Sequence, residues 1–287
     1  MKQKHTGIKA SSMNSGPVIF LLDDYPGAGA AYSVRKLDSN YSGDCMEITR
    51  ASDSTTQNIG FDGSGDLDTA AINSFCTGTT CYVTVWYDQG PNGYDLSSNS
   101  GDWSIYESGN VVTKNGRPAI KNVDPGVNLE ASGVNIAHLV GSNAFYGIVV
   151  GTYQANAADI GTYYVSTSSA GIYALGHGYN FAAEEVFMYL GFSSGSYGTS
   201  PINTGDQEII EGLKVSSSQD DVYINGVQID SGNPYSASWA PTGTEDLLIG
   251  GGTISAPCES IQEVILYPSN QNSNRANIYA NVSGYYY

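Results

Sequence analysis

The sequence is poor in basic side chains: 11 Lys and Arg stand against 28 Asp and Glu among 287 residues, a formal net charge of −17. This charge would repel a polyanion, so we do not expect a protein that binds nucleic acid. Long apolar runs are also missing. Because no stretch of 18 consecutive apolar residues occurs, no membrane-spanning helix is predicted.

Histidine is scarce, and His5, His138 and His177 are too scattered to suggest a zinc site or a catalytic triad. Residues 62–68, DGSGDLD, alternate oxygen ligands as a calcium loop does. They lack the Gly and Glu that such a loop carries at its sixth and twelfth places. A helix N-cap explains these aspartates better, so the sequence predicts no metal site and no cofactor.

The first ten residues, MKQKHTGIKA, do not have the form of an export signal. Residues 1–17 contain Lys2, Lys4 and Lys9 but no Asp or Glu. We therefore expect a basic N-terminal arm over residues 1–17, which either docks onto an acidic surface or is a floppy terminus. One acidic domain is expected over residues 18–287.

The abundant residues are those of a turn-rich β-protein, with 35 Gly, 10 Pro and 22 Tyr. In residues 81–87, alternation places Tyr82, Thr84 and Trp86 on one face and Val83, Val85 and Tyr87 on the other. Strands are predicted over residues 18–22, 81–87, 145–153, 161–168, 171–176, 186–192, 208–216, 221–230, 245–251 and 261–269.

Turn and helix signals complete this pattern. The pairs Asn225-Gly226 and Asn115-Gly116 predict hairpins with type I′ turns. A short helix is predicted over residues 66–75, capped by Asp66 or Asp68, and a second over residues 273–286. The sequence thus predicts an all-β fold, an antiparallel β-sandwich with one or two short helices.

Two of the four cysteines bracket a tight turn in FCTGTTC, residues 75–81. A bond between Cys76 and Cys81 would close a small ring and fasten the helix end to the next strand. We expect this disulfide, with two buried free thiols as the alternative. Whether Cys45 and Cys258 also pair is left open.

Four blocks in the first half of the chain resemble the catalytic domain of α-L-arabinofuranosidase B: AYSVRKL, RASDSTTQNIGF, FCTGTTC and YDQGPNGYDL occur in the same order. The resemblance implies a concanavalin A-like β-sandwich, or jelly roll, that cleaves arabinofuranosides. Similar blocks also occur in bacteriophage structural proteins and tail-fibre modules. The resemblance also implies that the disulfide between Cys76 and Cys81 belongs to the scaffold, at the corner between the helix and the strand that follows it.

The resemblance also implies an acid/base Asp after an IGG motif, but Gly252 stands at that position here. Glycoside hydrolysis needs two carboxylates, so without this proton donor the sequence predicts no catalytic residue. Glu184 and Glu185 are the weak candidates for a nucleophile, with Asp246 or Glu259 as a partner, although adjacent glutamates are more often a solvated turn. Asp88 in the YDQ motif is expected to fasten its turn through backbone N–H groups.

These features lead to three hypotheses. The first is a non-catalytic surface protein of a bacteriophage virion, a fibre, decoration or adhesion protein that contacts host-surface glycan. It would be made in the host cytoplasm, released by lysis, and assembled as a homo-oligomer with other virion proteins. The second is an active α-L-arabinofuranosidase-like glycoside hydrolase. The third is a purely structural virion protein without a ligand. The sequence leaves the ligand-binding residues of the first two unknown.

Overall fold

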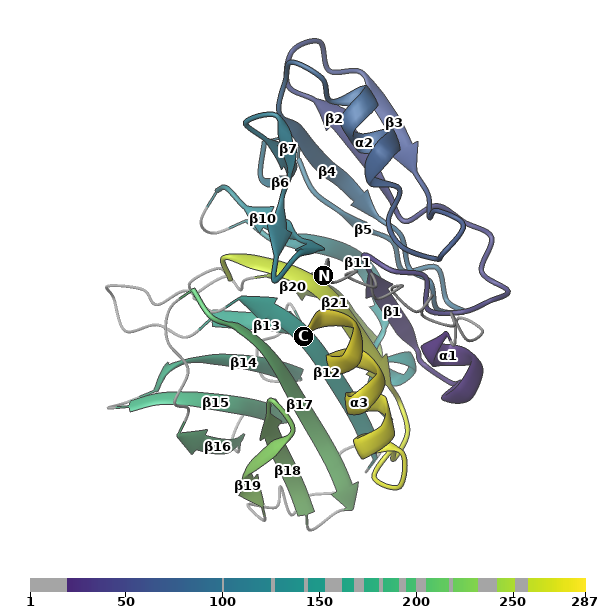
Figure 1. Cartoon of the computed structure of the whole chain (residues 1–287). Coiled ribbons are helices and arrows are strands. Elements are labelled where there is room, and N and C mark those ends of the chain that lie inside the picture. The colour runs from purple at the N-terminus through teal and green to yellow at the C-terminus, as the bar shows by residue number, and fades with distance from the viewer. Residues whose placement is uncertain are drawn as a thin grey trace, which may run out of the picture.

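The structure is a computed structural model of the chain (Figure 1). It describes residues 20–99, 101–124, 127–141, 144–152, 162–167, 173–180, 183–190, 195–199, 205–216, 219–231, 242–250 and 258–287. The predicted arm over residues 1–17 and the position of Gly252 lie outside the described residues. The arm and the single domain over residues 18–287 therefore remain predictions.

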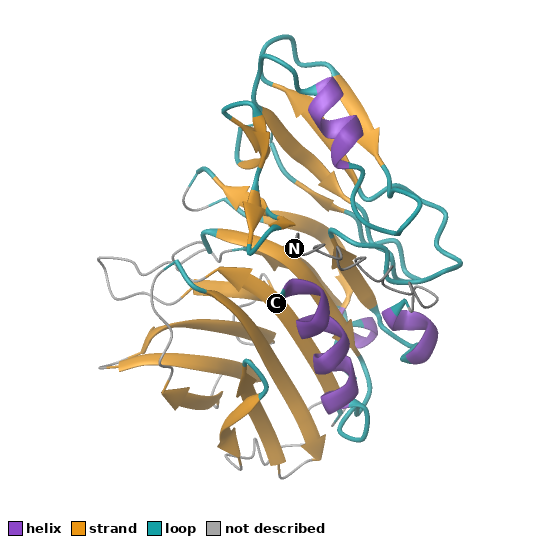
Figure 2. Ribbon diagram, in the orientation of Figure 1, coloured by secondary structure: helices purple, strands orange, loops and turns teal. Residues whose placement is uncertain are grey.

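Two antiparallel layers of strands pack face to face, which confirms the predicted β-sandwich (Figures 1 and 2). The first layer runs in the order β19, β18, β17, β12, β21 and β1. The strands of this layer are β1 (Ala30–Ser33), β12 (Phe145–Thr152), β17 (Gln207–Ser216), β18 (Gln219–Ile224), β19 (Val227–Ser231) and β21 (Ser260–Tyr267).

The second layer runs in the order β11, β20, β13, β14, β15 and β16. Glycines let the two layers approach closely: a Cβ at Gly212 of β17 would lie 2.6 Å from the Met188 sulfur of β15, and one at Gly151 would meet the Tyr164 ring at 2.3 Å. The strands of this layer are β11 (Leu129–Asn135), β13 (Thr162–Thr167), β14 (Tyr173–Asn180), β15 (Ala183–Leu190), β16 (Gly195–Thr199) and β20 (Thr244–Ile249).

A smaller sheet from the first half of the chain continues from these layers, with helix α2 (Thr69–Phe75) packed on it (Figure 1). It pairs with the sandwich through β5 to β11 and through β10 to β21. Its strands are β2 (Met46–Arg50), β3 (Thr56–Ile59), β4 (Cys81–Trp86), β5 (Leu96–Ser97), β6 (Trp103–Glu107), β7 (Asn110–Val111) and β10 (Ile120–Asn122).

Helix α3 (Arg275–Tyr286) lies across the outer face of β12, β17 and β21 (Figure 1). It covers buried acids that the strands carry on that face. Arg275 donates to Glu211 at 2.9 Å, and the Tyr286 hydroxyl donates to Glu263, which also accepts from Arg35 at 2.8 Å. These pairs explain how charged residues occupy fully buried strands without an unpaired charge. None of the described helices has the length and apolar character needed to cross a membrane.

Both predicted hairpin turns are confirmed. Asn225 and Gly226 have φ values of 48° and 77° between β18 and β19, as a type I′ turn requires. Asn115 and Gly116 have the same values between β8 (Thr113–Lys114) and β9 (Arg117–Pro118). Helix α2 is also confirmed, since the Asp68 carboxylate accepts from Ala71 N at 2.9 Å as its N-cap.

Two local predictions are wrong. Of residues 18–22, Leu21 and Leu22 belong to the one-turn helix α1 (Leu21–Asp24) and Phe20 is its N-cap; acidic side chains in this turn favour helix over strand. In β4, Val83 and Trp86 are both fully buried, although strict alternation places them on opposite faces. Glu47 pairs with Val85 and Ile48 with Val83, so Thr84 is the extra residue of a β-bulge that resets the alternation.

Candidate functional site

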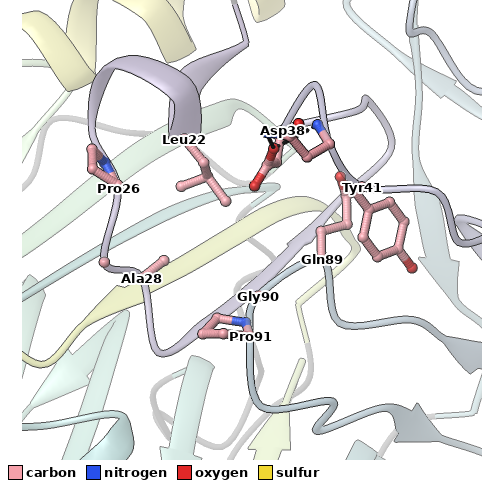
Figure 3. Close-up of a pocket in the computed structure, with 10 residues that line it drawn as sticks. Leu22, Pro26, Ala28, Asp38, Tyr41, Gln89, Gly90 and Pro91 are labelled. Atoms are coloured by element: carbon pink, nitrogen blue, oxygen red, sulfur yellow. Dashed lines mark hydrogen bonds between the residues drawn. The ribbon is translucent and has the colours of Figure 1, made fainter.

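A pocket of about 330 Å³ lies where three loops of the first half of the chain meet (Figure 3). We call it the N-terminal pocket. The loops are the one that follows α1, the one before β2, and the turn after β4. Its lining residues are Leu22, Pro26, Gly27, Ala28, Asp38, Asn40, Tyr41, Gln89, Gly90 and Pro91.

The YDQ motif fixes the walls of this pocket. Buried Asp88 accepts from Ala31 N at 2.8 Å, from Gly90 N at 2.7 Å and from Tyr94 N at 3.1 Å. Burial raises the pKa of the Asp88 carboxyl, and these N–H donors oppose the rise. The expected role of Asp88 as a turn anchor is therefore confirmed.

Gln89 joins the same turn to the neighbouring loop. Its Oε1 accepts from Leu37 N at 2.8 Å, and its Nε2 donates to the carbonyl oxygens of Ser33 and Arg35 at 3.2 and 3.0 Å. All of the hydrogen-bonding capacity of the Gln89 amide nitrogen is thus directed at backbone. These hydrogen bonds hold the Gln89 side chain in place at the pocket wall, so hydrogen bonds to a ligand would come from the other lining residues.

The polar wall consists of Asp38, Asn40 and Tyr41. Asp38 Oδ1 accepts from Asn40 N at 2.7 Å. The Tyr41 hydroxyl donates to Asp44 O at 2.9 Å, and its ring meets Phe61 edge to face at 6.4 Å, so the ring is held in place. Burial raises the pKa of the Tyr41 hydroxyl.

The N-terminal pocket therefore combines a fixed aromatic ring and apolar walls with carboxylate and amide groups. Such a combination suits a ligand that has apolar faces and hydroxyl edges, as sugars do. Asp38 is the one carboxylate among the lining residues, so this pocket can hold a sugar but lacks the carboxylate pair that cleaves one.

The candidate nucleophiles lie elsewhere, on the second layer. Glu184 and Glu185 are in β15, where their backbones pair with Tyr179 and Gly178 of β14. Their side chains lie outside what the structure describes. Both residues lie within β15, so the prediction that adjacent glutamates form a solvated turn is wrong for their backbone.

Asp246 is not brought to these glutamates. Its neighbour in β20, Leu247, pairs with Thr167 at one end of β13. At the other end of β13, Thr162 pairs with His177 of β14. The next residue of β14, Gly178, is the one that pairs with Glu185. This register separates the two positions by about six residues, roughly 20 Å, along the strands. Asp246 Oδ1 instead accepts from Gly133 N at 3.1 Å, at the bulge of β11.

Glu259 immediately precedes β21, where its N–H donates to Thr152 O at 3.0 Å. It is half-buried and lines a hollow of about 310 Å³ together with Glu107 and Lys121. Lys121 Nζ donates to Glu107 at 2.8 Å. Burial raises the pKa of Glu107, but the contacts with Lys121 and Ser104 outweigh it and lower the pKa overall.

The cysteines are placed as follows. Cys76 and Cys81 form a disulfide that joins the end of α2 to the start of β4. Cys45 and Cys258 are free and fully buried, and burial raises the pKa of both thiols. Within the described ranges, no three His, Cys, Asp or Glu side chains gather to hold a metal ion.

Sequence reasoning missed Asp38, Asn40 and Tyr41. They stand in the polar stretch DSNYSGD, which signals a turn and nothing more. The YDQ motif was the usable signal, because the turn it anchors forms the opposite wall.

The antiparallel sandwich with a sugar-sized pocket is an architecture that carbohydrate-active proteins use. The profile of the family described as "Alpha-L-arabinofuranosidase B, catalytic" matches residues 19–216. The chain belongs to this family. The resemblance noted from the first-half blocks is thereby confirmed for the arabinofuranosidase part.

Individual relatives agree. The chain is 35% identical over 122 residues to α-L-arabinofuranosidase B of Emericella nidulans, over 38% of this chain and 24% of that protein. It is 37% identical over 90 residues to α-L-arabinofuranosidase B of Aspergillus niger, over 31% of this chain and 18% of that protein. The matched part thus spans a quarter or less of these relatives.

Solved structures show the same fold. An arabinofuranosidase complexed with arabinofuranosyl-α-1,2-xylobiose superposes with a TM-score of 0.66 at 22% identity, over 91% of this chain and 64% of that one. A GH54 α-L-arabinofuranosidase soaked with a cyclic sulfate inhibitor gives a TM-score of 0.64 at 18% identity, with the same coverage.

These comparisons overturn the first hypothesis. The family and the relatives are arabinofuranosidases of fungi, and none of these matches is a virion protein. The predicted location in a virion is therefore wrong, and so is the prediction of virion proteins as partners. The error arose because net charge and the composition of the first residues do not define a protein class, whereas the first-half blocks belong to the enzyme family.

Proposed function

We propose that the chain is a glycoside hydrolase that releases arabinose from arabinofuranosyl-bearing polysaccharides. Membership of the α-L-arabinofuranosidase B catalytic family, over residues 19–216, is the observation that carries this proposal. The N-terminal pocket supports a sugar ligand, because it has the size for a sugar and a fixed aromatic ring, while the catalytic groups are sought elsewhere.

Hydrolysis requires a general acid beside a nucleophile or general base. We assign the nucleophile to Glu184 or Glu185, and the acid/base to Glu259. Asp246 is the weaker partner, because it is roughly 20 Å along the strands from Glu185 and holds the β11 bulge. Glu259 is half-buried in a hollow that also holds a second carboxylate, Glu107.

The test is the release of 4-nitrophenol from 4-nitrophenyl α-L-arabinofuranoside. We expect turnover by the wild-type chain and a loss of about a hundredfold or more in Glu259→Gln and in one of Glu184→Gln and Glu185→Gln, since each change removes one carboxylate and little volume. Glu47→Gln is the matched control, because Glu47 lies in β2 and bonds Thr84. Its turnover should equal that of the wild type.

Circular dichroism and thermal unfolding would establish that each variant is folded. Folded wild-type protein that releases no 4-nitrophenol at high concentration would overturn the proposed function. Equal turnover in the wild type and the three carboxylate variants would overturn the assignment of the residues.

A further inference from the structure

A second hollow, of about 570 Å³, lies beside β5 and β11. We call it the β5–β11 hollow. The two strands pair through Ser97 and Glu130, and Ser97 Oγ donates to Glu130 O at 3.2 Å. Its lining residues are Ser97, Ser98, Asn99, Val127, Asn128 and Glu130.

The lining is almost wholly polar and offers both donors and acceptors. Serine hydroxyls and asparagine amides can do either, whereas the Glu130 carboxylate only accepts. Ser98 Oγ bonds Asp102 at 3.2 Å, and Ser132 Oγ bonds Glu130 at 2.9 Å, so two of these groups are held by their neighbours. The ligand that matches such a lining is one whose own groups both donate and accept, as hydroxyl groups do.

Buried polar atoms without partners concentrate next to this hollow. Asn128 Oδ1, which belongs to a lining residue, is buried and has no hydrogen-bond partner. Trp103 Nε1 and the Nδ2 and Oδ1 atoms of Asn122 are likewise buried without a hydrogen-bond partner. More than nine in ten buried polar groups in proteins are hydrogen-bonded, so four such atoms from three residues are an exception that calls for a partner.

These three residues are neighbours in the fold. Asn122 pairs with Trp103 across β10 and β6. Leu129 pairs with Ile249, so Asn128 stands beside Gly250, and a Cβ at Gly250 would lie 2.1 Å from the Trp103 ring. Asp102 links this group to the hollow, because it accepts from Ser98 Oγ and its carbonyl accepts from Val123 N at 2.8 Å.

We propose that the β5–β11 hollow binds a neutral oligosaccharide through its hydroxyl groups, with Asn128 as a principal contact. Its volume suits a ligand of two or three sugar units. An anionic sugar is disfavoured by Glu130 and by the net charge of −17. The ligand class rests on the proposed function. Because β11 is four strands from β15 in the second layer, roughly 19 Å, the hollow would hold the backbone of the polysaccharide away from Glu184 and Glu185.

The experiment titrates the full chain with xylotetraose, which carries no arabinofuranosyl group to be released. Binding is followed by calorimetry and by amide chemical shifts, and tetragalacturonate is the anionic comparison. Asn128→Leu replaces the amide by an apolar group of similar size. Asn73→Leu makes the same change on an exposed position of α2, outside the hollow.

We expect saturable binding of xylotetraose, shifts at residues 97–99 and 127–130, and no binding of tetragalacturonate. Asn128→Leu should weaken binding about three- to tenfold, as the loss of one neutral hydrogen bond does, while Asn73→Leu leaves it unchanged. Asn128→Leu should also keep or raise the melting temperature, because it removes an unpaired buried acceptor.

The absence of shifts in the hollow, or equal affinity of wild type and Asn128→Leu, would refute the site. Should Asn128→Leu fail to fold, Glu130→Gln provides the second variant, and unchanged xylotetraose affinity in it would likewise count against the site. The arabinoside assay is separate: a chain that releases no 4-nitrophenol can still bind xylotetraose here, and an active chain can fail to bind it.

Discussion

Glu211 should make the stability of the protein fall as the pH rises through the neutral range. Its side chain is fully buried beneath α3, where Oε1 accepts from the Tyr146 hydroxyl at 2.7 Å and Oε2 accepts from Arg275 at 2.9 Å. Burial disfavours the charged form more than these two contacts favour it. The pKa of Glu211 is consequently raised from 4.5 to about 7.

The sign follows from proton binding. Between pH 4.5 and 7 the folded protein keeps the Glu211 proton, whereas the unfolded chain releases it, so raising the pH favours the unfolded chain. A shift of about 2.5 pKa units corresponds to about 3 kcal/mol at 1.36 kcal/mol per unit. The contribution is fully present below pH 4.5 and is lost as the pH rises through 7.

The assay is urea unfolding of the wild type and Glu211→Gln at pH 5 and pH 8. Gln stays neutral at both values, so the stability of wild type relative to Glu211→Gln should fall by about 2–3 kcal/mol between them, since a small part of the contribution is already lost at pH 5. Comparing the two proteins cancels the other titrating groups. A difference between wild type and Glu211→Gln that is the same at both pH values would refute the reasoning.

Three further changes test the scaffold by urea unfolding. Replacing Cys76 and Cys81 together by Ser should cost about 2 kcal/mol, because the unfolded chain gains the freedom of a short loop; an unchanged midpoint would show that the bridge adds nothing. Asp68→Ala should lower the free energy of unfolding by about 1 kcal/mol, because α2 loses its N-cap. Asp68→Asn should keep most of the wild-type stability, because Asn also caps a helix. Gly226→Val should cost at least about 1–3 kcal/mol, since φ is +77° there and its Cβ would meet the Tyr279 ring at 2.6 Å; wild-type stability would contradict that turn geometry.

The sandwich could be predicted because its strands carry local signals. The hairpin around Asn225 and Gly226 requires residues of positive φ, and β12 is an apolar run bounded by turn residues. Asp88 could be assigned because an Asp before a Gly turn has backbone N–H groups within reach. In each of these cases the cause lies within a few residues of the effect.

The remaining features depend on partners that are distant in the sequence. The bulge at Thr84 is set by the pairing of β4 with β2, and alternation alone cannot reveal it. The burial of Glu211, a charged residue in EIIEGLKVS, depends on Tyr146, 65 positions earlier, and on Arg275, 64 positions later. The N-terminal pocket likewise brings Asp38 and Pro91 together, because Gln89 accepts a hydrogen bond from Leu37 N. Nothing in the sequence of either segment predicts that the two lie side by side.

The contacts of β1 have a consequence for how the polypeptide folds during synthesis. Ser33 and Arg35 bind Glu263, which is 230 and 228 residues away, and Ser33 also contacts Tyr286. A ribosome must therefore finish residues 260–286 before the first strand gains its neighbour, and until then the early segment exposes an unsatisfied edge and a guanidinium without its carboxylate. Such long-range closure slows folding, and during that interval the unpaired edge of the early segment is exposed to aggregation.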